Sequence, residues 1–342
     1  MFNPHGVKLD QEKTASLKNG IRPIDWEEAP ALPRSFSSAR KDADAVQILA
    51  AADHAGIVDE TDGRPLGNRL SSFAACGTDL LVLHGFDDDP YASSAQAFVR
   101  ESAEKAAAGL QLAAEACGAR RVIFAVASRH EQHLLSHWNV TVPVQPVVKR
   151  YPAGILLMRE LSRNGAKAEF VGAQACAALL DAVRRGKPQT ETVVTVAGDG
   201  VKNCGNYRVR IGMPIAAVLK TVKAYDRAQL VAVHSSVMGD PVLDISAPVT
   251  AATRIIYVQR KVRLKNMLAC VRCGRCAAAC PVGIVPWLVH RELEKQQPDP
   301  ILFFHVNECV RCRACELVCP SGIDLAEEVR RAAALKEGDD AE

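Results

Sequence analysis

The sequence lacks the features that mark several large classes of protein. It has no apolar run near the roughly 20 uncharged residues that a membrane-spanning helix needs. Its first residues have neither the basic start nor the apolar stretch of a secretion signal. The formal net charge of +3 is too small to indicate a nucleic-acid-binding protein. These absences predict a cytoplasmic protein, or one that is peripheral to a membrane.

The composition is that of a folded globular protein. Hydrophobic residues make up 48% of the chain and charged residues 24%, which excludes a disordered or fibrous protein. The chain has 342 residues. At about 150 residues per domain, that length favours two or three domains.

Cysteine is the informative residue type. The chain has twelve cysteines, of which eight lie between Cys270 and Cys319. Disulfide-rich proteins are usually short and secreted, whereas this chain is long and rich in Ala, Val and Leu. In a reducing compartment, clustered thiolates indicate a metal site.

The eight clustered cysteines form a repeated motif. Both blocks spell C-x2-C-x2-C-x3-C-P, the first starting at Cys270 and the second at Cys309. Three thiolates at this spacing wrap one iron–sulfur cubane, and the fourth cysteine, followed by proline, ligates the other cubane. We therefore expect two [4Fe-4S] clusters: cluster I on Cys270, Cys273, Cys276 and Cys319, and cluster II on Cys309, Cys312, Cys315 and Cys280.

Zinc is the alternative metal, because paired C-x2-C knuckles also make tetrahedral sites. Zinc would leave the third cysteine of each block and the proline unexplained.

The segment 254–275 carries seven basic residues and no acidic one. This bias either compensates the anionic clusters on ordinary solvated surface or forms a docking face for an acidic redox carrier; the sequence leaves both open.

Other candidate sites are weaker. His130, His133 and His137 would share one face of a helix over 129–138, but we interpret them as solvated surface residues. Gly198-Asp199-Gly200 is interpreted as a hairpin turn rather than a phosphate loop, because no helix follows it directly. Three of the scattered cysteines are expected in the core: Cys76, Cys117 and Cys176. The fourth, Cys204, is expected in an exposed turn.

The patterns before the cysteine blocks predict an α/β fold followed by a smaller module. Strands are expected at 79–84 and 121–126, joined by a long helix that Ser93 or Ser94 caps and that ends before Gly118. Strand, helix, strand in this order implies a parallel, right-handed crossover. Further helices are expected at 129–138, from Pro152 and at 174–185. The module that follows is expected to be a β-grasp or a similar α+β fold. Its short strands are predicted at 192–197, 206–211, 229–234 and 255–262, with a helix at 215–223.

The order of these motifs resembles a known family, the C subunit of the Rnf electron-transport complex, and its relative, the cobalamin reductase of propanediol-utilisation microcompartments. The resemblance covers roughly residues 52–335 and ends in the two cysteine blocks. Before those blocks it rests on five segments: 78–91 (TDLLVLHGFDDDPY), 150–154 (RYPAG), 194–212, 237–240 and 247–250.

The resemblance implies an α/β protein with three domains. It implies a Rossmann-like domain of the complex I flavoprotein type, a β-grasp domain of the soluble-ligand-binding (SLBB) type and a C-terminal two-cluster bacterial ferredoxin-like domain. The family's N-terminal barrel-like domain is expected to be missing, since too few residues precede the match. The expected divisions are an extension at 1–45 that packs on or trails from the first domain, then domains at 46–189, 190–262 and 263–337, and an acidic tail at 338–342.

The resemblance also implies FMN and NADH, with Asp87, Asp88, Asp89 and Tyr91 in a loop that faces flavin. The family has Ala-Glu-x-Glu in that loop, and before the first strand it has a glycine-rich loop that approaches the flavin phosphate. In this chain the glycine-rich loop corresponds to 56–67, and Asp59, Glu60 and Asp62 replace glycines there. A carboxylate repels phosphate and a Cβ blocks close approach, so we expect FMN to bind weakly or not at all, and the same changes oppose NADH.

These observations predict an electron-transfer oxidoreductase subunit that relays single electrons through two [4Fe-4S] clusters. Its partners are expected to be an acidic ferredoxin or flavodoxin, or the subunits of a larger electron-transfer complex. Two alternatives stay open: an FMN-dependent NADH or corrinoid (cobalamin) reductase, and a non-redox assembly or scaffold protein. The resemblance places the protein in the cytoplasm, at the membrane periphery or in a microcompartment.

Overall fold

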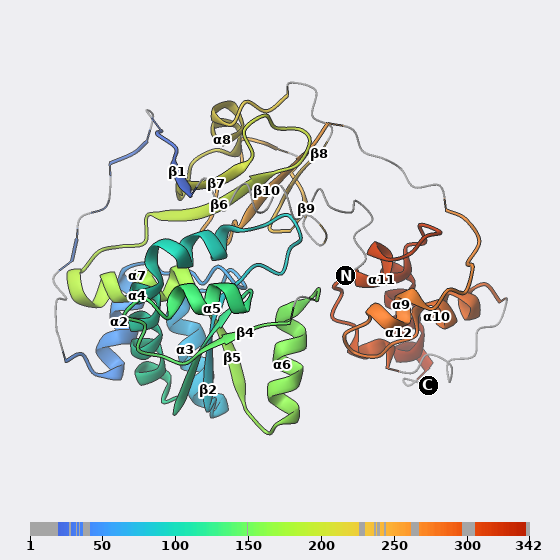
Figure 1. Cartoon of the computed structure of the whole chain (residues 1–342), viewed down its shortest axis with the longest axis horizontal. Helices are drawn as coiled ribbons and strands as arrows, with labels where there is room; N and C mark the ends of the chain where they lie inside the picture. Colours follow the sequence, from blue (N-terminus) through green and yellow to red (C-terminus); the bar gives the residue numbers. More distant parts are fainter. Residues whose placement is uncertain are drawn as a thin grey trace.

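The computed structural model describes most of the chain from Gly20 onward. The described residues are 20–26, 29–31, 33, 35–36, 42–148, 150–225, 230–235, 237, 240–242, 244–260, 267–295 and 305–339. Several residues of the sequence patterns lie outside this set: most of the 1–45 extension, Gln229, Met238, Gly239, the basic residues Lys261, Arg263 and Lys265, the strand end at Val262, and the last three residues of the tail. Figure 1 shows two sheets with their helices and, to one side of them, a separate group of C-terminal helices.

The first sheet is parallel throughout and has the strand order β4-β3-β2-β5. Its middle strand β2 (Leu80–Gly85) is completely buried, as expected for a sheet covered on both faces. The predicted parallel crossover from β2 to β3 is confirmed. The remaining strands are β3 (Arg121–Val126), β4 (Val144–Pro146) and β5 (Ala168–Gly172). Because β5 pairs on the other side of β2 from β3, the strand order of the sheet reverses between β2 and β5.

Helices cover both faces of this sheet. One face packs against α2 (Ala45–His54), α3 (Leu66–Cys76), α4 (Ser94–Cys117) and α7 (Ala173–Arg185), and the other against α6 (Ala153–Arg163). The short helix α5 (Arg129–Leu135) precedes β4. Helices α4 and α7 approach closely at Gly109, where a Cβ would lie 1.8 Å from the carbonyl oxygen of Cys176. Gly118 and Gly186 end these two helices in the left-handed conformation, as the sequence predicts for Gly118.

The N-terminal cap of α4 differs from the prediction. Ser93 occupies the N-cap position, but its side chain makes no capping hydrogen bond. The carboxylate of Asp87 instead accepts hydrogen bonds from the backbone amides of Ala95 and Gln96, at 3.2 and 3.1 Å. The carboxylate also interacts favourably with the positive end of the helix dipole.

The second sheet has the order β1-β7-β6-β10-β8-β9. Its central strands form a predominantly antiparallel module with one helix, as expected for the second domain: β6 (Glu191–Ala197), β7 (Gly205–Arg210), α8 (Ile215–Thr221), β8 (Leu230–Val233), β9 (Asp240–Pro241) and β10 (Ile255–Gln259). The edge strand β1 (Ile21–Pro23) pairs in parallel with β7. The extension was expected to pack on or trail from the first domain; this part of it joins the second sheet, where β7 offers a free edge.

The C-terminal region consists of short helices around the cysteine blocks. They are α9 (Arg275–Ala279), α10 (Pro286–Leu293), the 3-10 helix η2 (Val306–Glu308), α11 (Ala314–Leu317) and α12 (Leu325–Asp339). Helix α12 packs on α10 through Val289, Val329 and Ala332. This apolar layer supports the loops that carry the cysteines.

The other cysteines are placed partly as expected. Cys117 and Cys176 are buried, which confirms the prediction, but Cys76 is exposed because it lies at the end of α3, beside the Gly77 cap. Cys204 is half-buried, and its thiol donates to the carbonyl of Gly198. Within the described part of the chain, no helix is both long and apolar enough to cross a membrane.

Candidate metal centres and the acidic crevice

The two cysteine blocks adopt the same backbone. Arg272 and Gly274 in the first block are left-handed, with φ of 52° and 71°, and the equivalent Arg311 and Arg313 have φ of 51° and 54°. A non-glycine residue in the left-handed conformation costs roughly 1 kcal/mol. Three arginines in this conformation therefore indicate that the surrounding structure stabilises the turns by more than this cost. Such turns direct successive amides to one side, as binding of cluster sulfides requires.

Four cysteines line one small hollow in this region. Cys280, the last cysteine of the first block, lies there with the first three of the second block: Cys309, Cys312 and Cys315. The rest of the wall is largely apolar and includes Pro281, Val282, Ile284, Ala326 and Val329. Burial raises the pKa of the Cys312 thiol, and the neighbouring Cys280 and Cys309 raise it further.

The other four cysteines converge from both blocks. Cys270, Cys276 and Cys319 pack in one cluster with Trp287, Ile323 and Leu325, and Cys315 of the second block packs there as well. The backbone joins the two ends of the region here, since the amide of Leu268 donates to the carbonyl of Ser321 at 3.0 Å. Burial is the largest cause of the raised pKa of Cys276, with further contributions from Cys270 and Cys273. Cys273 is exposed.

These donor sets fit two [4Fe-4S] clusters better than zinc. In a cubane each iron takes one thiolate, so the four sulfurs lie around the cluster rather than around one ion. Among the described residues, no three His, Cys, Asp or Glu side chains are placed to hold a single metal ion. Ligand thiols with raised pKa values must lose protons on binding, and only a strong metal–thiolate bond offsets that cost.

A second candidate site lies at the carboxyl end of the first sheet. Ligands of open parallel sheets bind where the strand order reverses, which here is between β2 and β5. The segment expected to face flavin follows β2 at this place. Its side chains bind other parts of the chain: Asp88 accepts from the amide of Gly154 at 2.9 Å, Asp89 accepts from the hydroxyl of Ser235 at 2.6 Å, and Tyr91 packs on Tyr257.

Asp59 reaches the same edge of the sheet from the loop before α3. It is fully buried, and its carboxylate accepts from the amide of Gly172 at 3.1 Å. The guanidinium of Arg69 forms an ion pair with Asp59 and also binds Asp62, with 3.0 Å between Nε and Oδ2. Arg69 is itself only 8% exposed, so Asp59 has a permanent buried counter-ion.

Glu60 occupies the N-terminus of α7. Its two carboxylate oxygens accept from the amides of Gln174 and Ala175, at 2.7 and 3.0 Å. A Cβ on Gly172 would lie 2.1 Å from a carboxylate oxygen of Glu60, so glycine is required for this approach. A helix N-terminus that follows a parallel strand is the usual position of a nucleotide phosphate. In this chain Glu60 takes that position.

The residues of this crevice therefore do not fit a flavin phosphate. The amides that would bind it already donate to Asp59 and Glu60, and a phosphate would add negative charge beside two carboxylates. The sequence anticipates the repulsion. It does not indicate that the carboxylates replace the phosphate or that Arg69 supports them.

We expect little affinity for FMN. Calorimetric titration of the cluster-loaded chain with FMN should give a dissociation constant weaker than about 10 μM, because binding must displace two buried carboxylates. The variant Asp59→Gly with Glu60→Gly, which frees the amides, is the comparison. Sub-micromolar affinity of the unsubstituted chain would contradict this assignment of the crevice.

Glu60 also predicts a pH dependence of stability. Burial, followed by the charge of Asp59, raises its pKa from 4.5 to about 7. A raised carboxyl pKa contributes stability that is complete below the unfolded value and is lost as the pH rises through the folded value. The unfolding free energy should therefore fall by on the order of 3 kcal/mol between pH 4.5 and 8 through this group.

Denaturation of the chain at pH 5.5 and pH 8 measures this dependence. The variant Glu60→Gln cannot ionise and should show a flatter pH profile, even if its absolute stability is lower because the amide NH2 faces a helix N–H donor. An identical profile in the two proteins would show that Glu60 does not titrate in this range.

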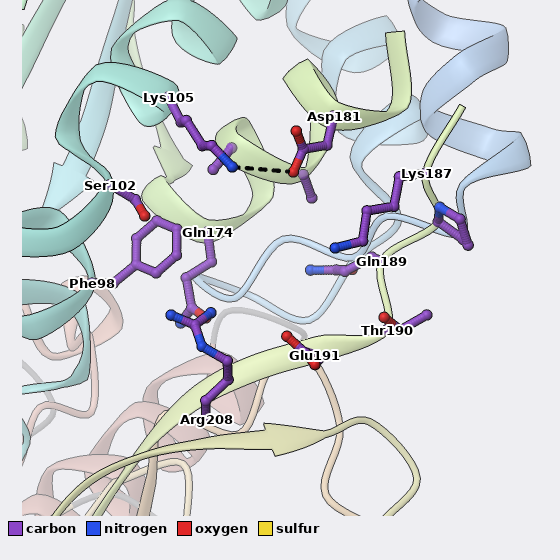
Figure 2. Close-up of a pocket in the computed structure, with 13 residues that line it drawn as sticks. Phe98, Ser102, Lys105, Gln174, Asp181, Lys187, Gln189, Thr190, Glu191 and Arg208 are labelled. Carbon is purple, nitrogen blue, oxygen red and sulfur yellow. Dashed lines mark ion pairs between the residues drawn. The ribbon is translucent and has the colours of Figure 1, made fainter. Parts of the chain in front are cut away.

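A third hollow, of about 150 Å³, lies between α4, α7 and the segment that enters β6 (Figure 2). It is lined by charges of both signs, and Lys105 and Asp181 pair across it at 3.6 Å. Arg208 is paired with Glu101 at 2.9 Å. Since these charges neutralise each other, this hollow offers no net attraction for a charged ligand.

The three histidines interpreted as surface residues lie around α5. The helix ends at Leu135, so it includes His130 and His133 but not His137. The rings of His133 and His137 are 5.0 Å apart in an edge-to-face contact.

The segment from β6 to β7 is a connection between antiparallel strands, which confirms the turn expected at Gly198-Asp199-Gly200.

Comparison with known proteins supports the cluster site directly. Residues 269–323 match the family described as "4Fe-4S dicluster domain". This match contains all eight cysteines of the two blocks. The C-terminal region therefore belongs to the two-cluster ferredoxin-like class, with two [4Fe-4S] clusters as its cofactors.

Curated relatives extend the similarity to the rest of the chain. The C subunit of the ion-translocating oxidoreductase complex of Rhodobacter capsulatus is 27% identical over 289 residues, covering 78% of this chain and 55% of the relative. Its namesake from Pasteurella multocida is 26% identical, covering 60% of this chain and 27% of the relative. The chain thus spans about half the length of the first of these relatives, and less of the second.

A solved structure has the same fold. The crystal structure of NAD+-reducing [NiFe]-hydrogenase in the H2-reduced state superposes with a TM-score of 0.53 at 16% identity, covering 85% of this chain and 61% of the hydrogenase chain. Identity at that level shows the fold alone, and it confirms the predicted α/β class. The resemblance seen in the motifs is also confirmed: the chain is a relative of the C subunits of ion-translocating oxidoreductase complexes and ends in a 4Fe-4S dicluster domain.

Proposed function

We propose that the chain is an electron-transfer oxidoreductase subunit that relays single electrons through its two clusters. The observation that carries the proposal is that cysteines of both blocks meet among apolar residues at two places, one at Cys280 and Cys312 and one at Cys276 and Cys319. A [4Fe-4S] cluster supplies one-electron chemistry without a proton donor or acceptor. The crevice formed by the described residues does not fit a flavin phosphate, so we assign no two-electron cofactor to it.

We assign the ligands across the two blocks. Cluster I is held by Cys270, Cys273, Cys276 and Cys319, and cluster II by Cys280, Cys309, Cys312 and Cys315. The shared hollow supports the second set. The packing of Cys319 with Cys270 and Cys276 supports the first, and Cys315 lies in contact with this group as well as with the hollow. Each block thus contributes three ligands to one cluster and one to the other.

The chain's own residues hold and tune these clusters. The left-handed turns at Arg272 and Arg311 orient backbone amides, and hydrogen bonds from amides to cluster sulfurs raise the reduction potential. The apolar walls, including Ile284 and Val329, exclude water from cluster II. Both effects act on the potential without a catalytic side chain.

The partners are proposed to be acidic redox proteins, such as a ferredoxin or flavodoxin, or other subunits of an electron-transfer complex. Arg272 and Arg311 are exposed, and each directly precedes the second cysteine of its block. Positive charge at the point where electrons leave attracts an acidic carrier and orients it. The relatives, which are named as parts of a complex, favour an assembled partner.

Two other functions are less well supported. An FMN-dependent NADH or corrinoid reductase requires a flavin site, and the crevice is filled by Asp59 and Glu60. A scaffold protein would not need intact ligands in both blocks. Colour separates the first of these from the relay, because bound FMN adds resolved flavin bands to the broad brown absorbance of clusters.

An anaerobic reductive titration tests the proposal. The reconstituted chain should take up two electrons per molecule in one-electron steps and then pass them to an oxidised acidic ferredoxin. A cluster-loaded chain that cannot be reduced reversibly, or that cannot pass electrons to any redox protein, would contradict the relay function.

A further inference from the structure

The two clusters differ in their contact with the α/β part of the chain. Figure 1 shows α6 on the side of the first sheet that faces the C-terminal helices. The segment leading into α6 makes the contact: the Tyr151 hydroxyl donates to the carbonyl of Cys312 at 2.7 Å. Arg150 donates to the carbonyl of Ala278. Arg159, on α6 itself, donates to the carbonyl of Pro281.

Two of these carbonyls belong to cluster II in the proposed assignment: Pro281 follows Cys280 directly, and Cys312 is itself a ligand. The third, Ala278, lies two residues from Cys280 and two from Cys276. The α/β part of the chain therefore supports one cluster from both of the blocks that ligate it.

The surroundings of cluster I are exposed and apolar. Met267, Leu268 and Val271 have exposed fractions of 63%, 64% and 66%, which is unusual for large apolar side chains placed together. Leu268 is fixed in place because its amide donates to the carbonyl of Ser321, close to Cys319. The exposed Arg272 follows Val271 directly. We call Met267, Leu268, Val271 and Arg272 the outer surface.

The composition of the outer surface indicates the chemistry of its partner. Apolar side chains favour a protein that offers an apolar patch, and Arg272 favours acidic residues around that patch. Cys273, the exposed ligand of cluster I, lies beside this surface, so a bound protein would lie close to the cluster. A small acidic redox protein meets these requirements.

We propose that the relay has a fixed polarity: Arg150, Tyr151 and Arg159 are positioning residues that hold cluster II against the α/β part of the chain, and an acidic redox protein docks on the outer surface over cluster I. The inference rests on the proposed relay function and deepens it. It assigns cluster I to the entry or exit of electrons at a protein partner. Cluster II is then the end of the relay that the fold itself positions.

The first half is tested by redox titration followed by electron paramagnetic resonance. Cys273→Ser identifies the signal of cluster I. Tyr151→Phe and Arg159→Met, studied separately, should each lower the potential of cluster II and leave that of cluster I unchanged, because each removes a donor or a positive charge near cluster II. A shift of cluster I, no shift in either variant, or shifts of different clusters in the two variants would overturn the proposal.

The second half is tested by the rate of electron transfer to a small acidic [2Fe-2S] ferredoxin. Leu268→Ser with Val271→Ser should slow transfer at low protein concentration roughly tenfold, through loss of apolar contact, and leave both potentials unchanged. Val46→Ser is the matched control: this valine is 74% exposed, but it lies on α2, away from the C-terminal helices in Figure 1. Equal rates in the two variants would overturn the docking surface.

The same measurements separate this inference from the relay function. If both clusters are reduced reversibly, but the substitutions at Tyr151 and Arg159 shift cluster I or the substitutions at Leu268 and Val271 leave the transfer rate unchanged, only the polarity is contradicted. Missing clusters, or clusters that exchange no electrons in the unsubstituted chain, contradict the relay itself.

Discussion

The chain with Cys280→Ala and Cys312→Ala together should keep about four irons, whereas the chain with Cys276→Ala and Cys280→Ala should keep almost none. In the crossed assignment the first pair removes two ligands of cluster II and leaves cluster I complete. The second pair lies within one sequence block but removes a ligand from each cluster. Iron analysis after anaerobic reconstitution therefore distinguishes crossed from uncrossed ligation.

The control is Cys117→Ala, which removes a buried cysteine outside the two blocks and should keep about eight irons. Far-ultraviolet circular dichroism checks that each variant remains folded. If the pair Cys276 and Cys280 leaves four irons and the pair Cys280 and Cys312 leaves none, each block holds its own cluster and the crossed assignment is wrong.

Reversing two exposed charges should weaken both reduction and docking. Arg272→Glu with Arg311→Glu changes the charge beside each cluster by two units. The interaction of a cluster with a two-unit change of charge, across partly solvated protein, is worth about 1 kcal/mol, or about 40 mV for one electron. The reduction potential of at least one cluster should therefore fall by tens of millivolts. Electron transfer from an acidic carrier should slow more at low salt than at high salt, because salt screens the lost attraction.

Protein-film voltammetry and stopped-flow reduction measure the two effects separately. Arg184→Glu is a suitable control, since it reverses a charge on α7, in the α/β part of the chain. If neither the potential nor the salt dependence changes while the clusters stay intact, the basic residues are ordinary solvated surface.

Local patterns predicted the long elements well. The helix from Ser94 to Cys117 was expected from its apolar spacing and from Gly118, and the strand pair around it was expected from short apolar runs. Strand β5 (Ala168–Gly172) was not predicted, because it is short and only half apolar and lies between two helices. The pairing of β1 with β7 depends on residues far apart in the sequence, which no local pattern reports.

The same division applies to the sites. Cysteine spacing predicts the two-cluster domain and its candidate donor residues, because cluster ligation imposes a nearly invariant local geometry. The contact of Tyr151 with Cys312 arises only when α6 meets the C-terminal helices. Asp59 and Glu60 were recognised as unfavourable for phosphate, but their partners Arg69 and the α7 amides come together only in the folded chain.

The central claim is that this chain carries two [4Fe-4S] clusters, and quantification of iron and acid-labile sulfide in the anaerobically reconstituted chain tests it most directly. The account predicts about eight irons and about eight sulfides per chain, as two cubanes require. One bound zinc ion with no sulfide would contradict it.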